Sequence, residues 1–261
     1  MPIVECPRDR DRFTTAFAQR ASRLVAPGAA RRRHGEAVMA KPSKTALFNA
    51  AKKWDCGTVA AILGDVPDLI AATDPKHRTA LHLACSVRPS ETGGLLEPNG
   101  LKTVETLLEA GALLEQAVPM DGDAGDVQAT PLWYAVARGE NRPLVEFLLR
   151  RGANPSHSLW AAVWRDDDAM CRALLEFTPT LNLRAHGETP IFYAARLQRL
   201  ATLRLLIDAG ADPSIVDDRG RDCVDIARER RLPSDIVAML EALRERIKGQ
   251  ADAQAPARRT A

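Results

Sequence analysis

The chain repeats one short phrase along its length, and this internal period constrains the fold more than any other feature. Each copy runs through a small polar residue, Pro or Ala, an apolar pair and then Ala, and a second apolar phrase follows it. The copies are KTALFNAAKK from Lys44, RTALHLACS from Arg78, ATPLWYAVARG from Ala129, ETPIFYAARLQ from Glu188 and RDCVDIARER from Arg221. A period of roughly 20 to 50 residues indicates stacked, similar supersecondary units that share one core.

This pattern resembles the ankyrin repeat family, whose unit carries TPLHxA followed by a helix that ends in LLxxGAD. TALHLA at Thr79–Ala84 and LLIDAGADP at Leu205–Pro213 are close matches, and the resemblance covers about residues 44 to 247. A weaker unit begins at His157 with HSLWAAVWRDDDAMCRALL. The resemblance implies an all-α ankyrin-repeat solenoid of about six helix-turn-helix repeats with an extended concave face, starting near residues 45, 79, 130, 157, 189 and 222.

The irregular spacing of these starts locates the departures from a regular stack. An insertion at 88–102 (RPSETGGLLEPNGLK) separates the two helices of the second repeat, and extra residues fall in the turn around VPMDGDAGD. Between Gly152 and His157 too few residues remain for a finger, which is the hairpin loop that normally precedes a repeat. We expect a basic, mobile segment at 1–40, the repeat domain at 41–250 and a disordered tail at 251–261.

Elementary chemistry explains the phrase. Thr before the first helix can accept a hydrogen bond from a free backbone N–H, and Pro at the first helical position forfeits no hydrogen bond. Gly111, Gly152 and Gly210 stand where each second helix must end in a left-handed conformation. In the family, the residue at the position of His82 bonds the loop backbone, so we expect a structural role for it.

Motifs that carry chemistry are missing from the sequence. It holds no GxGxxG, P-loop, GxSxG or HExxH pattern, and its five cysteines form no CxxC pair. Asp121, Asp123 and Asp126 do not fit an EF-hand, because Gly125 and Leu132 stand where acidic ligands are required. We therefore expect no enzyme activity, no cofactor and no metal. Apolar runs are too short to span a bilayer.

The odd number of cysteines argues against a disulfide framework and for a reducing compartment, so we expect a cytoplasmic protein, with secretion into a host left open. Arg far outnumbers Lys, which indicates a GC-rich, bacterial genome. A net charge of +2 spread over 261 residues, with a slightly acidic repeat region, does not resemble a nucleic-acid-binding domain.

The resemblance implies that partners bind to finger residues and to the eighth and ninth residues of each phrase, counting the small polar residue (Thr79 in the second repeat) as the first. Those positions are mainly basic. One of them holds a tryptophan that either serves as an interface anchor or packs under a neighbouring finger. The predicted partner-binding residues are Lys52, Lys53, Lys76, Arg78, Arg138, Trp164, Arg165, Arg196, Arg219, Arg221 and Arg230.

The sequence thus predicts a monomeric, non-enzymatic adaptor that binds an acidic protein through a basic concave groove. Two alternatives stay open. The first is a polyanion or nucleic-acid binder, for which a strong loss of affinity with salt would be expected. The second is an enzyme or a secreted, host-directed ankyrin effector, whose site would be built from loops, chiefly the 88–102 insertion.

Overall fold

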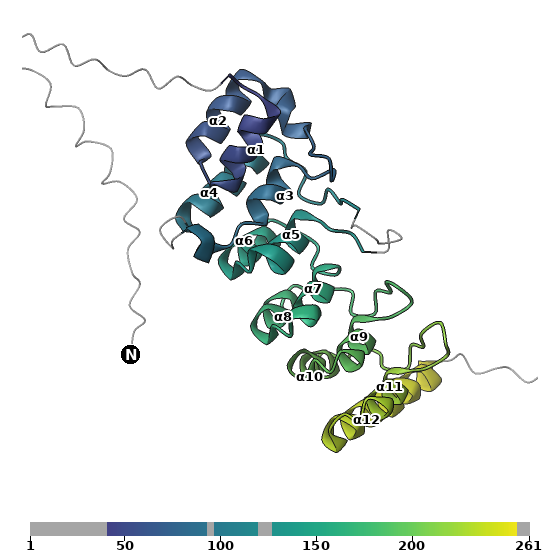
Figure 1. Ribbon diagram of the computed structural model, residues 1–261. Helices are drawn as coiled ribbons and strands as arrows, with labels where there is room; N and C mark the ends of the chain where they lie inside the picture. The colour runs from purple at the N-terminus through teal and green to yellow at the C-terminus, as the bar shows by residue number, and fades with distance from the viewer. Residues whose placement is uncertain (1–40, 93–96, 120–126, 255–261) are drawn as a thin grey trace, which may run out of the picture. The chain divides into compact units, whose positions relative to one another are not determined.

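The computed structural model describes residues 41–92, 97–119 and 127–254, and these residues form a stack of paired helices (Figure 1). The segment 1–40 and the aspartates of the MDGDAGD turn lie outside the described residues. The helices are α1 (Lys44–Lys52), α2 (Cys56–Asp65), α3 (Ala80–Cys85), α4 (Glu97–Glu109), α5 (Pro131–Tyr134), α6 (Arg142–Arg150), α7 (Ser158–Arg165), α8 (Asp168–Leu175), α9 (Pro190–Arg196), α10 (Leu200–Asp208), α11 (Cys223–Glu229) and α12 (Ser234–Gln254). Short turns of other helix types are η1 (Pro67–Ala71), η2 (Pro89–Thr92) and η3 (Ala135–Gly139).

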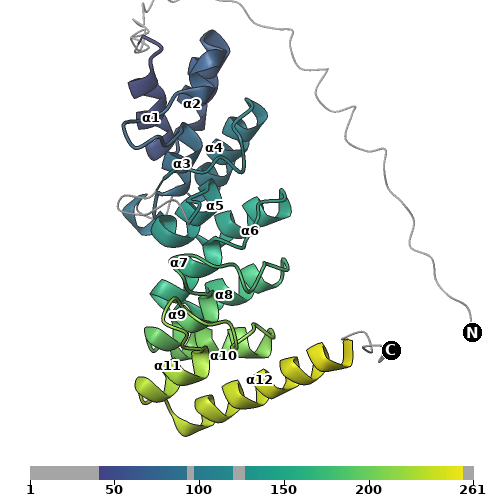
Figure 2. The same ribbon diagram turned by 90° about the vertical axis from the view of Figure 1, so that its right-hand side faces the viewer.

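The helices form two parallel rows (Figure 2). The odd-numbered helices contact one another in order along the first row, and the even-numbered helices do the same along the second. Extended pairing is confined to two isolated bridges among the described residues, Val118 with Ala129 and Ala185 with Glu188. The prediction of an all-α helix-turn-helix solenoid is confirmed.

A single motif position supplies much of the core. The third residue of the phrase, counting the small polar residue as first, is fully buried in all six repeats. These residues are Leu47, Leu81, Leu132, Leu159, Ile191 and Val224. Because small Ala residues accompany them, the helices of neighbouring repeats approach closely and need no large side chains between them.

Polar residues before the first helices fix where those helices begin. Thr130 Oγ1 accepts a hydrogen bond from the backbone N–H of Trp133 at 3.3 Å, and Asp222 accepts one from Asp225 at 2.9 Å. In the first repeat, Ser43 Oγ accepts the capping hydrogen bond from the backbone N–H of Ala46. Ser43 lies two residues before the predicted start of that repeat at residue 45. Thr189 makes no such bond, so the cap is not used in every repeat.

Glycines end the second helices as the sequence predicts. Gly111, Gly152 and Gly210 have φ values of +94°, +91° and +83°, in the left-handed region that side chains with a Cβ disfavour. The chain can therefore reverse within one residue and enter the loop that leads to the next repeat.

The insertion at 88–102 is partly helical. It contains η2, and its last residues form the beginning of α4, which explains why α4 is longer than most helices in its row. Gly100 of α4 packs on the ring of Trp54, so closely that a Cβ at this position would lie 2.9 Å from the ring atoms. At the other end of the stack, α12 continues into the segment expected to be a disordered tail and ends at Gln254.

Candidate partner-binding site

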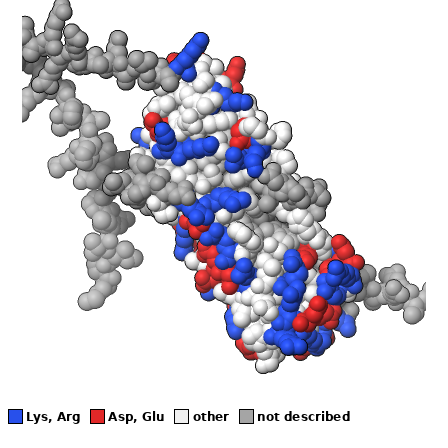
Figure 3. All heavy atoms as spheres, viewed as in Figure 1, with Lys and Arg blue, Asp and Glu red and all other residues white. Residues whose placement is uncertain are grey.

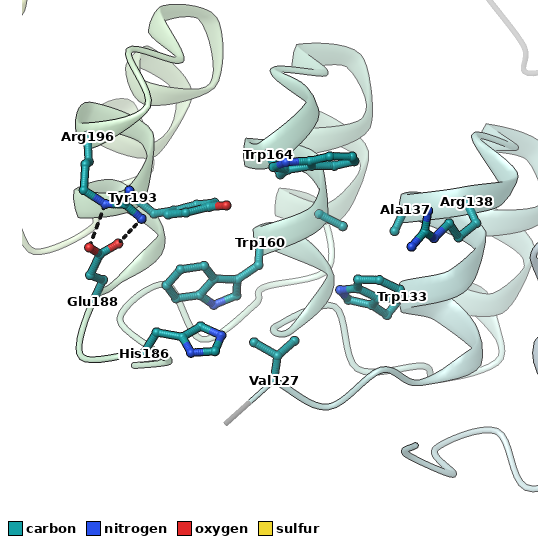
Figure 4. Close-up of a pocket in the computed structure, with 11 residues that line it drawn as sticks. Val127, Trp133, Ala137, Arg138, Trp160, Trp164, His186, Glu188, Tyr193 and Arg196 are labelled. Carbon is teal, nitrogen blue, oxygen red and sulfur yellow. Dashed lines mark hydrogen bonds and ion pairs between the residues drawn. The ribbon is translucent and has the colours of Figure 1, made fainter. Parts of the chain in front are cut away.

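The first row of helices and the loops before them enclose a hollow of about 560 Å³ in the middle of the stack (Figure 4). We call it the aromatic hollow. It is lined by Val127, Trp133, Ala137, Arg138, Trp160, Ala161, Trp164, His186, Glu188, Tyr193 and Arg196. Three consecutive repeats contribute to it, so no single repeat could form this surface.

Large rings make up most of its walls. Trp160 and Trp164 are one helical turn apart on α7 and therefore lie on the same face of that helix. The ring of Trp160 packs against that of Tyr193 with centroids 5.0 Å apart. Trp133 and Trp160 are almost fully buried, whereas Trp164 keeps 50% of its surface exposed.

A missing finger leaves the hollow open. The chain passes directly from the end of α6 to α7, and no bridge forms there among the described residues. The loops before α5 and α9 each contain one of the two isolated β-bridges. These loops place Val127 and His186 at the lower edge of the hollow (Figure 4). The short connection expected between Gly152 and His157 accounts for this gap.

The charged groups at the rim differ in what they contact. Arg196 pairs with Glu188 through two contacts, Nε to Oε1 at 2.7 Å and Nη2 to Oε2 at 3.0 Å, and its guanidinium lies 5.1 Å from the centroid of the Tyr193 ring. Both carboxylate oxygens of Glu188 are therefore engaged. Arg138 is exposed and makes no ion pair with any carboxylate of the described residues.

A second hollow of about 360 Å³ adjoins the first, and we call it the basic hollow. Trp133 and Arg138 line both hollows. The full lining of the basic hollow is Lys76, Arg78, Ser86, Pro119, Trp133, Tyr134 and Arg138, with three cationic side chains and no carboxylate among these described residues.

Two further observations describe the charge in the basic hollow. Arg78 is held by Asp74, whose Oδ2 lies 2.7 Å from its Nη2, so part of its charge is already compensated. Burial raises the pKa of the Tyr134 phenol, while the nearby charges of Arg78, Arg138 and Lys76 act in the opposite direction. The phenol therefore stays protonated at neutral pH and can donate a hydrogen bond.

A local irregularity of the backbone positions Arg138. The third repeat holds one residue more than the fifth between its motif Thr and the cap of its second helix, and the extra residue is accommodated by the π-helical turn η3. Gly139 in this turn approaches the second repeat so closely that a Cβ would collide with the backbone carbonyl oxygen of Cys85. Next in the chain, Glu140 adopts a left-handed conformation with φ of +48°.

The predicted residues fall into two groups. Lys76, Arg78, Arg138, Trp164 and Arg196 line one or both hollows, and the remaining six line neither. Within the second group, two arginines are paired with carboxylates: Arg165 with Glu140 at 2.5 Å, and Arg221 with both Asp217 and Glu229. The others in that group are Lys52, Lys53, Arg219 and Arg230.

The charged surface in the view of Figure 3 is consequently mixed. Lys and Arg side chains stand among Asp and Glu side chains, most densely at the C-terminal end of the stack, and uncharged surface separates these groups. The excess of basic residues counted along the sequence is thus reduced by pairing in three dimensions.

Sequence reasoning missed Trp133, Trp160 and Tyr193. A usable signal was present, because the first two stand at the fourth position of the phrase, where His82 stands in the second repeat. At that position His82 accepts a hydrogen bond from the Thr79 N–H at Nδ1 and contacts the Gln116 carbonyl oxygen through Nε2 at 2.9 Å, so its predicted structural role is seen. A ring in place of this histidine makes no such bonds and is available to line a hollow.

Other kinds of site find no support in the described part of the chain. Among residues 41–92, 97–119 and 127–254, no group of three or more His, Cys, Asp or Glu side chains is placed to hold a metal ion. Within the same residues, no helix is both long and apolar enough to cross a membrane.

Comparison with known proteins agrees with this architecture. Residues 132–217 match a family profile described as ankyrin repeats in three copies. A protein of Acanthamoeba polyphaga mimivirus that is named for ankyrin repeats is 30% identical over 97 residues, which make up 34% of this chain and 12% of that protein. The chain thus matches only a small part of that relative's length.

Solved structures resemble the stack over most of its length. An ankyrin repeat domain from Acinetobacter baumannii AYE has a TM-score of 0.60 and 24% identity, covering 77% of this chain and 98% of that one. A chain from the complex of a predatory endopeptidase of Bdellovibrio bacteriovorus with an immunity protein has a TM-score of 0.56 and 24% identity, covering 77% and 99%. The ankyrin repeat domain of Bcl-3 has a TM-score of 0.51 and 21% identity, covering 77% and 100%. At these identities the likeness shows the fold.

Proposed function

We propose that this chain, as a member of the ankyrin repeat family, is a non-enzymatic adaptor. In this proposal it binds an acidic protein through the concave face of its stack. Ankyrin repeats are in general protein–protein interaction modules, and the fold is typically non-catalytic. The adaptor is proposed to act as a monomer in the cytoplasm, where the free thiols of Cys56, Cys85, Cys171 and Cys223 would remain reduced.

The exposure of Trp164 is the observation that carries the proposal. A tryptophan with half of its surface in water beside an open hollow leaves a large apolar area that a partner can cover. Binding energy at protein interfaces is concentrated in such rings and in nearby arginines. Arg138 at the rim of the same hollow is an arginine of that kind.

Charge favours an acidic partner. Arg138 has no carboxylate partner among the described residues, and the basic hollow beside it is lined by cations without an acid. An Asp or Glu of the partner would therefore meet the unpaired guanidinium of Arg138 at the wall between the two hollows. The same pairing pattern identifies Arg138 as the residue whose charge can be reversed without breaking an internal ion pair, unlike Arg165 and Arg196.

Affinity purification of the full chain from its native organism, followed by mass spectrometry, should capture a protein that Arg138→Glu and Trp164→Ala variants lose. With the captured protein purified, charge reversal at Arg138 should weaken binding by about 2 kcal/mol or more. The matched controls are Arg246→Glu on α12 and Leu113→Ala, because both residues are exposed and neither lines a hollow, and Arg246, like Arg138, has no ion pair among the described residues.

Two results would overturn the proposal. One is a captured protein that binds both groove variants as tightly as the parent chain. The other is displacement of every captured protein by duplex DNA, which would favour the polyanion-binding alternative.

A further inference from the structure

The aromatic hollow and the basic hollow share a wall made by Trp133 and Arg138. A ligand that enters one hollow therefore lies next to the other. The two differ in chemistry, since the first is walled by rings and the second by cations. Such a pair suits a ligand that has an apolar group and an anionic group close together.

The shape of the aromatic hollow indicates the apolar group. Its volume of about 560 Å³ lies within the range of small-molecule sites and exceeds the size of any single side chain. Trp164 lies above Trp160 on the same helix, and Trp133 and Tyr193 lie on opposite sides of them (Figure 4). A Leu, Phe or Trp side chain of a partner would pack against several of these rings at once.

The charges around the hollow decide the sign of the second group. Aromatic hollows can hold ammonium groups, but a cation here would need a free carboxylate. Arg196 engages both oxygens of Glu188, and Arg138 adds a positive charge on the opposite side (Figure 4). Cations are therefore repelled and a carboxylate is attracted.

We propose that the two hollows form one composite site for an extended peptide segment of a partner, in which a large apolar side chain enters the aromatic hollow while an Asp or Glu one to three residues away pairs with Arg138. This inference rests on the proposed function and specifies the partner chemistry. Consecutive Cα atoms are about 3.8 Å apart, so neighbouring residues of one segment can reach two hollows that share a wall.

Panning a phage-displayed library of random twelve-residue peptides on the full chain tests the proposal. We expect enriched sequences that combine a Leu, Phe or Trp with an Asp or Glu one to three residues away. Binding of the enriched phage should fall about tenfold or more on the Trp164→Ala protein and stay unchanged on the Leu113→Ala control.

A double-mutant cycle with a synthetic peptide from that selection tests the pairing itself. Arg138→Gln in the protein and Asp→Asn (or Glu→Gln) in the peptide should each lower affinity about tenfold, and the two changes together should cost little more than either alone. Arg246→Gln provides the control, because this exposed residue lines neither hollow and its substitution should leave the affinity unchanged with either peptide.

The possible outcomes separate the two proposals. If no sequence is enriched, if the enriched sequences are basic, or if the two changes are additive, the composite site is overturned. A native protein that still depends on Arg138 and Trp164 would then leave the proposed function standing. If native capture also proves independent of both residues, the adaptor proposal itself fails.

Discussion

Arg88 Nε donates a hydrogen bond of 3.0 Å to the backbone carbonyl oxygen of Arg138, 50 residues further along the chain. The same guanidinium places Nη2 2.5 Å from a carboxylate oxygen of Glu140, whose other oxygen lies 2.5 Å from Arg165. Arg88 comes from the second repeat and Arg165 from the fourth, so the π-helical turn between them is held from both sides. This turn is the segment that places Arg138 between the two hollows.

We expect Arg88→Ala to lower the free energy of unfolding by about 1 kcal/mol, because its partly exposed ion pair is screened while its hydrogen bond to the carbonyl is lost. The larger effect should be on binding, since the turn that carries Arg138 is no longer held. Urea unfolding measures the first effect and peptide titration the second. Arg142→Ala serves as the control, because Arg142 is also exposed and paired but lies on α6, outside both hollows.

Gly139→Ala should destabilise the chain by about 1 to 3 kcal/mol, because the new Cβ collides with the backbone carbonyl oxygen of Cys85 and neither backbone can move cheaply. Gly64→Ala in α2 is the matched control. Nothing lies within 4 Å of its Cβ position, so the substitution should be neutral or stabilise the helix by up to about 1 kcal/mol. Equal effects of the two substitutions in thermal unfolding would contradict the packing argument.

Stability should fall as the pH decreases from about 6.5 to 4, because burial of His82 lowers its pKa from 6.5 to about 4. The unfolded chain then binds a proton that the folded chain cannot accept. The loss attributable to this residue is on the order of 3 kcal/mol. Urea unfolding at several pH values should show that slope in the parent chain and a flatter one in His82→Gln, and an equal slope in both would refute the assignment.

The thiols of Cys85, Cys171 and Cys223 should resist iodoacetamide in the folded protein, whereas the half-buried Cys56 should react before these three. Burial raises the pKa of the Cys171 thiol to about 12 and raises those of the other two as well, so the reactive thiolate is scarce. Alkylation at rising urea concentration, with the modified cysteines identified by mass spectrometry, reports when each thiol becomes accessible. If the repeats open separately, the three buried thiols should become reactive at different urea concentrations. Simultaneous exposure would show that the stack unfolds as one unit.

The repeat period, the helical character and the turns could all be predicted from the sequence. These properties are encoded in contiguous segments: an apolar pair and an Ala define each first helix, and Gly111, Gly152 and Gly210 define the ends of second helices. The groove position of Trp164 followed from the same register, whereas its exposure is seen only in the structure. Local order of residue types is sufficient for such inferences, because each depends on neighbours within one repeat.

The candidate site required the tertiary structure. The charge of Arg196 is neutralised by Glu188 in the preceding loop, and this pairing is seen only in three dimensions. The stacking of three repeats brings Trp133, Trp160 and Tyr193 to one hollow. The one extra residue of the third repeat can be counted in the sequence, but the count does not show that a π-helical turn accommodates it and positions Arg138. The physical reason is that charge pairing and ring packing act across space between different repeats, whereas the period of a sequence describes only what each repeat does by itself.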